Sequence, residues 1–191
     1  MATIRRGKRW VAPGGATALG APPLSAARQR LPYRETSDCF ITYRGKLVAR
    51  TEVNKSTKIP FIRVPGGGIE VGETVLRGAR RKCLAEVGAK LRTIKLIVTI
   101  CWDWFPEWAN TELRRERYAK FRGEMIHILV GTVDKFITPA ADEQGEWGKN
   151  ILMPLSKAVK LVESGFAVDH PNTDPYRITQ LSVIKMLQLR K

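Results

Sequence analysis

The stretch Gly66-Gly67-Gly68-Ile69-Glu70-Val71-Gly72-Glu73 decides how this chain folds. It follows a short apolar run at residues 61–64, whose length and composition predict a strand. It precedes a segment, residues 73–87, in which apolar residues recur at helical spacing. The members of this stripe are Leu76, Ala79, Cys83 and Val87. Because Gly88 stands where a left-handed helix cap belongs, the sequence predicts a strand, a glycine loop and a helix that ends there.

Strand and helix patterns interleave on both sides of this unit. Strands are expected at 38–43, 47–53, 91–104 and 124–133, and helices at 154–164 and 174–190. We therefore expect one α/β (α+β) domain over residues 36–191, with the 174–190 helix as an addition at its C-terminal end. Residues 105–122, between two of the strands, are expected to form a polar, charged insertion.

The composition excludes several classes of protein. Hydrophobic residues make up 43% of the 191 residues, enough for a core, and no apolar run is long enough to span a membrane. Three widely spaced cysteines and two histidines argue against a structural zinc site. With 33 basic and 18 acidic residues the net charge is +15, which favours a polyanionic partner.

The positive charge is concentrated at the N-terminus. Residues 1–34 hold seven basic side chains and no acid, so residues 1–35 are predicted to be a flexible basic arm. Three interpretations of this arm stay open: a segment that contacts nucleic acid or docks a protein complex, an organelle-targeting peptide, or a linker. The chain is accordingly expected in the cytoplasm of a bacterial or phage-infected cell, with a mitochondrial location as the alternative.

With Glu73 and Arg81 in register, the glycine stretch resembles the Nudix box of the Nudix hydrolases. That box reads Gly, five residues, Glu, seven residues, then Arg-Glu and Glu-Glu before a closing Gly; here Gly67, Glu73, Arg81, Glu86 and Gly88 fall at the matching places. The resemblance implies the Nudix fold, a mixed β-sheet between helices, over about residues 36–165. It also implies that Glu73 and Arg81 brace the loop against the helix.

For the chemistry, the resemblance implies hydrolysis of a nucleoside diphosphate linked to another group, with Mg²⁺ or Mn²⁺ neutralising the phosphates. The family's metal ligands are a loop carbonyl, here that of Gly67, and three helix glutamates at positions 82, 85 and 86. This sequence has Lys82, Ala85 and Glu86 at those positions. At about 4 Å and an effective dielectric near 20, each unit charge is worth roughly 4 kcal/mol, so an ammonium in place of a carboxylate disfavours the metal strongly.

Two functions therefore stay open. In the first, the metal site is degenerate and the chain binds a nucleotide, an RNA (in preference to DNA) or a protein partner, with little or no hydrolysis. The phosphates would then contact Gly66, Gly67, Gly68 and Lys82. Trp104 would stack on a base, or, as an alternate residue at a strand end, pack into the core. In the second, the chain is an active pyrophosphohydrolase in which Gly67 and Glu86 hold Mg²⁺ or Mn²⁺ together with relocated ligands. The candidates for these are Glu70 and Glu73 on the loop, and Asp142, Glu143 and Glu146 before the later helix.

Weaker signals accompany these. Residues 114–122 form a basic run with two aromatics interleaved, which is typical of a phosphate-contacting loop and equally of a solvated helix face. His127 lies in an apolar strand and is expected to be a core histidine with its hydrogen bonds satisfied. The three cysteines are expected to be core residues.

Overall fold

The computed structural model describes residues 9–11, 25–53, 58, 60–137, 147, 151–166 and 175–189. Its strands are β1 (Arg9–Val11), β2 (Tyr33–Tyr43), β3 (Lys46–Val48), β4 (Arg50–Val53), β5 (Pro60–Arg63), β6 (Gly66–Gly68), β7 (Ala89–Asp103), β8 (Gly123–Phe136) and β9 (Leu152–Pro154). Its helices are α1 (Ala26–Gln29), α2 (Val75–Val87), the 3₁₀ turn η1 (Pro106–Trp108), α3 (Glu112–Lys120), α4 (Leu155–Phe166) and α5 (Pro175–Gln188).

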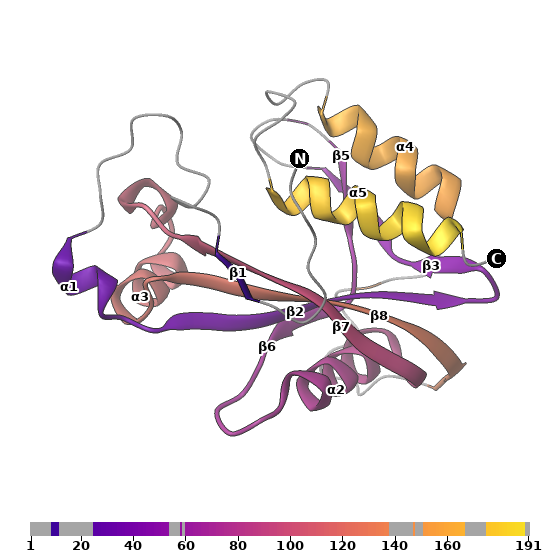
Figure 1. Cartoon of the computed structure of the whole chain (residues 1–191), viewed down its shortest axis with the longest axis horizontal. Coiled ribbons are helices and arrows are strands. Elements are labelled where there is room, and N and C mark those ends of the chain that lie inside the picture. Colours follow the sequence, from indigo (N-terminus) through magenta and orange to yellow (C-terminus); the bar gives the residue numbers. More distant parts are fainter. Residues whose placement is uncertain are drawn as a thin grey trace.

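A mixed sheet forms the middle layer of the described part of the chain. Its order is β1-β7-β8-β2-β3-β9, with β6 paired to β2. The β2–β8 and β1–β7 pairs are parallel and the other pairs of this sheet are antiparallel, while β4 and β5 form a separate two-stranded ribbon. Helix α2 lies on one face of the sheet, and α4 and α5 lie together on the other (Figure 1). The predicted mixed sheet between helices is confirmed.

The alternation of side chains along β2 builds the two halves of the core. Phe40 points toward α4 and α5, whereas its neighbours Cys39 and Ile41 point toward α2, and all three are fully buried. The period of two in this strand therefore places one apolar surface under each helical layer. Helix α2 packs on the surface that contains Cys39 and Ile41.

Helix α2 confirms the predicted box helix and corrects its apolar stripe. The helix begins after Thr74, whose side chain accepts a hydrogen bond from the Arg77 N–H, and it ends at Gly88 in the left-handed conformation. Ala79, Cys83 and Val87 are buried as expected, but Leu76 is 43% exposed. At 3.6 residues per turn, Leu76 lies about 20° from both Cys83 and Val87 around the helix axis, so it shares their face. It lies in the first turn of α2, so its exposure comes from its position along the axis and not from its angle.

The predicted C-terminal helix is confirmed as α5, which packs against α4 on the sheet. Within the segment expected to be a flexible arm, the structure places β1 beside β7 and α1 beside α3, and β2 already begins at Tyr33. The division of the chain at residue 35 stays a prediction. The insertion expected as a polar segment at 105–122 holds η1 and α3.

Candidate functional site

The glycine segment is held against β2 so closely that side chains are excluded. Gly66, Gly67 and Gly68 form β6 and pair with residues 36–38 of β2. A Cβ atom at Gly66 would lie 1.9 Å from the Ser37 carbonyl oxygen, and Gly67 has a φ of 144°. Only glycine tolerates both conditions, so the sequence positions this backbone at the edge of the sheet.

Glu73 and Arg81 brace the segment as the sequence predicts. Arg81 donates from Nε to Glu73 Oε1 at 3.0 Å and from its terminal nitrogen to Glu73 Oε2 at 2.7 Å. The same guanidinium donates to the Gly68 carbonyl oxygen at 3.3 Å. These hydrogen bonds from Arg81 lower the pKa of Glu73 to about 2. The pair therefore ties the start of α2 to the glycine segment.

Glu86 is buried, and its carboxylate receives hydrogen bonds from the protein itself. Its Oε2 accepts from the Gly66 N–H at 3.2 Å and from the Trp147 indole Nε1–H at 3.1 Å. Trp147 is 4% exposed, and nothing in the local pattern around it indicates this contact. Glu86 thus joins the glycine segment, α2 and Trp147.

The side chains of Lys82 and Glu86, both on α2, reach the same glycine of the segment, Gly67. A Cβ atom built on Gly67 would meet Lys82 Cε at 3.4 Å and Glu86 Oε1 at 3.8 Å, so both side chains flank this glycine. Ala85, at the remaining position expected to carry a ligand, has no donor atom in its side chain.

The side chains beside Gly67 do not suit the divalent metal that the Nudix resemblance implies. Mg²⁺ requires several hard oxygen ligands around one point. The described residues bring together no group of three His, Cys, Asp or Glu side chains that could hold a metal ion. The ammonium group of Lys82 beside a single carboxylate does not fit the ion. Of the relocated ligands expected, Glu70 and Glu73 pair with Arg81, and Asp142, Glu143 and Glu146 lie outside the described residues.

Two arginines of the β4–β5 ribbon also reach this region, and the sequence alone did not single them out. Arg50 and Arg63 are cross-strand partners, and their guanidinium carbons lie 4.8 and 5.9 Å from the centre of the Trp147 ring. They share one carboxylate, Glu52, at 2.7 Å from Arg50 and 3.3 Å from Arg63. This ribbon therefore brings two guanidinium groups close to Trp147, which is hydrogen-bonded to Glu86.

A second set of polar residues was missed on the face of β2 that carries α5. Asp38 is buried and accepts a hydrogen bond from the Tyr176 hydroxyl, and burial raises its pKa to about 6. Four residues before Asp38 on the same strand, Arg34 pairs with Glu124 at 2.7 Å. The Arg34 guanidinium also lies 3.3 Å from where a Cβ atom on Gly68 would be. Arg34, Thr36 and Asp38 alternate with Glu35 and Ser37, which are polar as well, so the sequence carries no alternating signal for a polar strip on this face.

Trp104, predicted to stack on a base, is not brought to the glycine segment. It follows the end of β7, is 2% exposed and stacks on Trp108 with ring centres 3.8 Å apart. His127 is confirmed as a buried histidine with partners, Thr99 at 2.9 Å and Glu35 at 3.2 Å. Cys39, Cys83 and Cys101 are buried free thiols, as expected for core residues.

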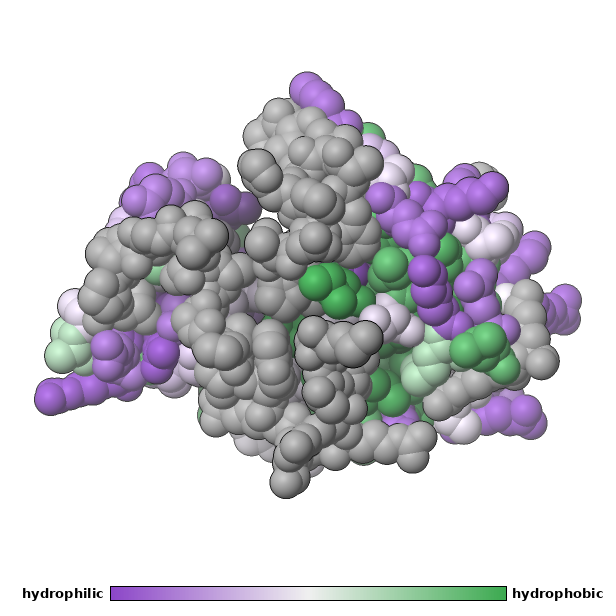
Figure 2. Space-filling view, turned by 45° about the horizontal axis from the view of Figure 1, so that its top comes forward, coloured by the Kyte–Doolittle hydropathy of each residue, from purple (hydrophilic) through white to green (hydrophobic). Residues whose placement is uncertain are grey.

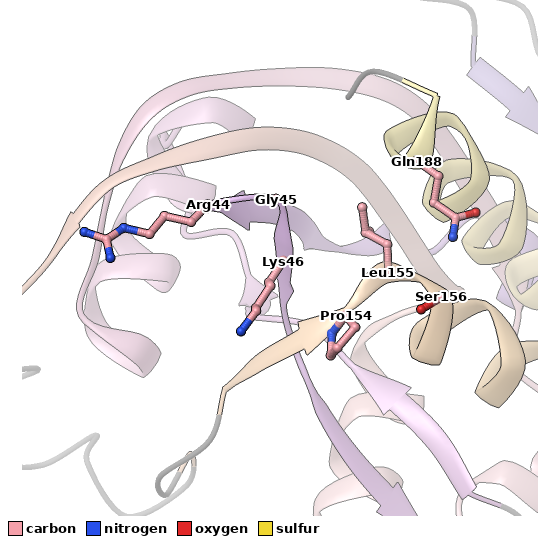
Figure 3. A pocket seen from close by; sticks show the side chains of 7 residues that line it. All are labelled: Arg44, Gly45, Lys46, Pro154, Leu155, Ser156 and Gln188. Carbon is pink, nitrogen blue, oxygen red and sulfur yellow. The ribbon is translucent and has the colours of Figure 1, made fainter.

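A cavity of about 410 Å³ lies apart from the box. Figure 3 shows its lining, which comes from the turn between β2 and β3, the start of α4 and the end of α5. The residues are Arg44, Gly45, Lys46, Pro154, Leu155, Ser156 and Gln188. The guanidinium of Arg44 points away from the other labelled side chains, so the cavity offers one converging cation, Lys46, and carries no functional argument.

Among the described residues, no helix combines the length and apolar character needed to cross a bilayer.

Comparison with known proteins agrees with this geometry. The chain resembles the crystal structure of an ADP compounds hydrolase with a TM-score of 0.54 at 16% identity, over 82% of this chain and 74% of that one. It resembles the mutator MutT protein from Bacillus halodurans with a TM-score of 0.52 at 14% identity, over 79% of this chain and 82% of that one.

These identities are low, so the two structures speak for the fold alone. No curated protein matches the sequence significantly. Residues 32–171, well over half of the chain, match the NUDIX domain family. The glycine segment, its Glu73–Arg81 brace and this match together show that the chain belongs to the Nudix family.

Proposed function

We propose that this Nudix-fold chain binds a phosphate-bearing nucleotide or RNA end at the box, and that it hydrolyses the ligand little or not at all. The observation that carries the proposal is the placement of Lys82 and Glu86 on either side of Gly67. In this arrangement an ammonium group takes the place of a metal ion as the positive partner of the phosphates.

The contacts of Glu86 support a structural role for its carboxylate. A metal ligand needs lone pairs directed at the ion, whereas Glu86 Oε2 accepts hydrogen bonds from Gly66 and Trp147. Its negative charge also attracts the ammonium group of Lys82 and so helps to hold that side chain beside Gly67.

The arginines of the β4–β5 ribbon supply a second phosphate contact. Arg50 and Arg63 flank Trp147, which is hydrogen-bonded to Glu86, so the ribbon lies next to the box. A guanidinium can hold two phosphate oxygens at once, and the ribbon places two of them close to Trp147. A ligand with two or more phosphates therefore fits this surface better than a monophosphate.

Titration calorimetry with ADP, ATP and a 5′-triphosphorylated RNA tests the proposal. Lys82→Glu removes an attraction and adds a repulsion, and we expect affinity to fall about tenfold or more. Lys90→Glu, the same change at an exposed residue at the start of β7, is the matched control and should alter affinity less than about threefold.

An equal effect of the two substitutions would show that only the net charge matters. Metal-dependent turnover of any of these ligands by the wild type would instead favour an active hydrolase with relocated ligands. Binding to RNA rather than DNA, docking of a protein complex by the N-terminal arm and the location in the cell stay predictions.

A further inference from the structure

We propose that the end of the sheet formed by α1, η1 and α3 binds a single-stranded nucleic acid, through a surface separate from the box. This surface, called here the α3 platform, comprises residues 25–30 and 105–122. It lies at the end of the sheet opposite α4 and α5 (Figure 1), and hydrophilic side chains gather there (Figure 2). The inference goes beyond the proposed function because it does not need a phosphate at Lys82.

The platform contains a preformed aromatic stack. Trp108 in η1 is half-buried and lies parallel to the buried Trp104, with ring centres 3.8 Å apart and planes at 9°. The guanidinium carbon of Arg114 is 5.3 Å from the centre of the Trp108 ring. A nucleobase can add to such a stack without preference for its identity, because every base has a π-face and arginine stacks as well.

Exposed cations surround this stack. Helix α3 carries four basic and two acidic residues, and Arg114, Arg115 and Lys120 are exposed. No ion pair joins these three to an acid within the described ranges, whereas Arg122 and Arg34 nearby are paired with Asp103 and Glu124. Arg114 donates to the Asn110 side-chain oxygen at 3.0 Å and lies over the Trp108 ring, which leaves its charge at the stack. A phosphate backbone can neutralise the three exposed cations.

The position of α3 is fixed by a contact from far away in the sequence. The Arg28 guanidinium of α1 donates to the carbonyl oxygens of Tyr118 and Phe121, both at 2.8 Å, and of Arg122 at 3.0 Å. It also lies 3.4 Å from the centre of the Tyr118 ring. Because these bonds hold the C-terminal end of α3 before any ligand arrives, the platform is preorganised for binding.

These features together select a single strand. Exposed cations alone would suit any polyanion, but a ring that stacks on a base requires a base that is not already paired inside a duplex. An acidic protein would use the cations and leave the aromatic stack without a role. Both RNA and DNA strands satisfy this chemistry, and the experiment has an arm for each.

Fluorescence anisotropy of the full chain with labelled single-stranded RNA and DNA tests the platform. The strands are about 12 nucleotides long, within the range bound by single modules, and carry 5′-hydroxyl ends so that a terminal phosphate at the box contributes nothing. Trp108→Leu, which fills space but cannot stack, should weaken binding about tenfold, and Trp108→Phe should restore most of the loss. A duplex of the same sequence should bind more weakly than either strand.

A second set of measurements tests the exposed cations and compares two triple variants that lose the same number of positive charges. Arg114→Ala with Arg115→Ala and Lys120→Ala should reduce the slope of log affinity against log salt by about two, since each phosphate contact contributes about 0.7. The control, Lys90→Ala with Arg92→Ala and Lys95→Ala, removes three exposed cations from the other end of β7 and should change the slope by less than about one. Thermal unfolding confirms that each variant is folded.

Two results would overturn the proposal: equal effects of the two triple variants, or unchanged affinity in Trp108→Leu. RNA and DNA strands bound equally well would leave the platform a general single-strand surface, while a clear preference would identify the nucleic acid. Lys82→Glu should alter binding of the 5′-hydroxyl strands less than about threefold, so a failure of the box proposal and a failure of the platform proposal are distinguishable.

Discussion

The two halves of the box share one helix and differ in what their charged side chains do. In the first half, Glu73 and Arg81 form a two-point hydrogen-bonded pair that ties the loop to the helix. In the second half, Glu86 is held by Gly66 and Trp147, and Lys82 lies beside Gly67. The difference teaches that the hydrogen bonds that shape the glycine segment come from Glu73, Arg81 and Glu86, and that none of those named here comes from positions 82 and 85. The loop can therefore keep its shape while the residues at positions 82 and 85 change.

The largest expected effect comes from converting the second half back to the family's pattern. Lys82→Glu with Ala85→Glu changes the local charge by three units and places three carboxylates on one helix face. We expect Mn²⁺ and Mg²⁺ affinity, measured by calorimetry, to rise at least about 100-fold. The control is Leu84→Glu with Lys90→Glu, the same charge change at exposed positions, which should leave metal affinity near the wild-type value.

Removing the Glu86 carboxylate tests its structural role. Glu86→Ala leaves the Gly66 N–H and the Trp147 indole N–H without their acceptor, and we expect a loss of about 2–4 kcal/mol in the free energy of unfolding. Glu86→Gln keeps one acceptor oxygen and should cost about 1 kcal/mol. Urea denaturation measures both; equal stability of Glu86→Ala and the wild type would mean that the carboxylate does not hold the segment.

Asp38 offers a contrast with Glu73, because it is a buried carboxylate beside the glycine segment whose hydrogen-bond partner, Tyr176, is uncharged. Its pKa is raised to about 6 by burial, so the folded state binds its proton more tightly than the unfolded state. Stability therefore falls as the pH rises through about 4 to 6. Asp38→Asn retains an acceptor for Tyr176 and should gain about 2–3 kcal/mol over the wild type between pH 4 and pH 8. A gain that did not depend on pH would contradict this origin.

The smallest effect is expected at the brace. The pKa of Glu73 is lowered to about 2, so the pair contributes stability that is present above the ordinary carboxyl pKa and is lost as the pH falls through about 2. Glu73→Gln should lower the melting temperature at pH 7, by less than Glu86→Ala does, because Arg81 is about a third exposed and water replaces part of the interaction. The deficit should disappear near pH 2; a deficit that persisted there would assign it to packing.

The local features of the box could be predicted from the sequence because each spans only a few residues. The glycine segment and α2 follow from patterns within residues 66–88, and the Glu73–Arg81 pair follows from the resemblance of that stretch to the Nudix box. The partners of Glu86 and Asp38 could not, since Trp147 is 61 positions from Glu86 and Tyr176 is 138 from Asp38. Contacts over such separations depend on strand order, which no local pattern contains.

Helix α3 was not resolved from the sequence for a different reason. It has no buried residue, so it lacks the apolar stripe by which a helix is recognised. Its position comes instead from Arg28, more than 90 residues earlier for two of the three bonds. The segment around Arg28 was expected to be part of a flexible arm because its composition is basic and has no apolar periodicity.

Turnover by the wild-type chain tests the central claim most directly. A panel of nucleoside diphosphate-linked compounds and 5′-triphosphorylated RNA is incubated with the protein, with Mg²⁺, with Mn²⁺ and without metal, and released phosphate and nucleotide are quantified. Our account predicts binding without metal-dependent release. Robust release that requires metal and is lost in Glu86→Gln would contradict the account and assign the catalytic role to Glu86 together with carboxylates such as Glu70, Glu143 or Glu146.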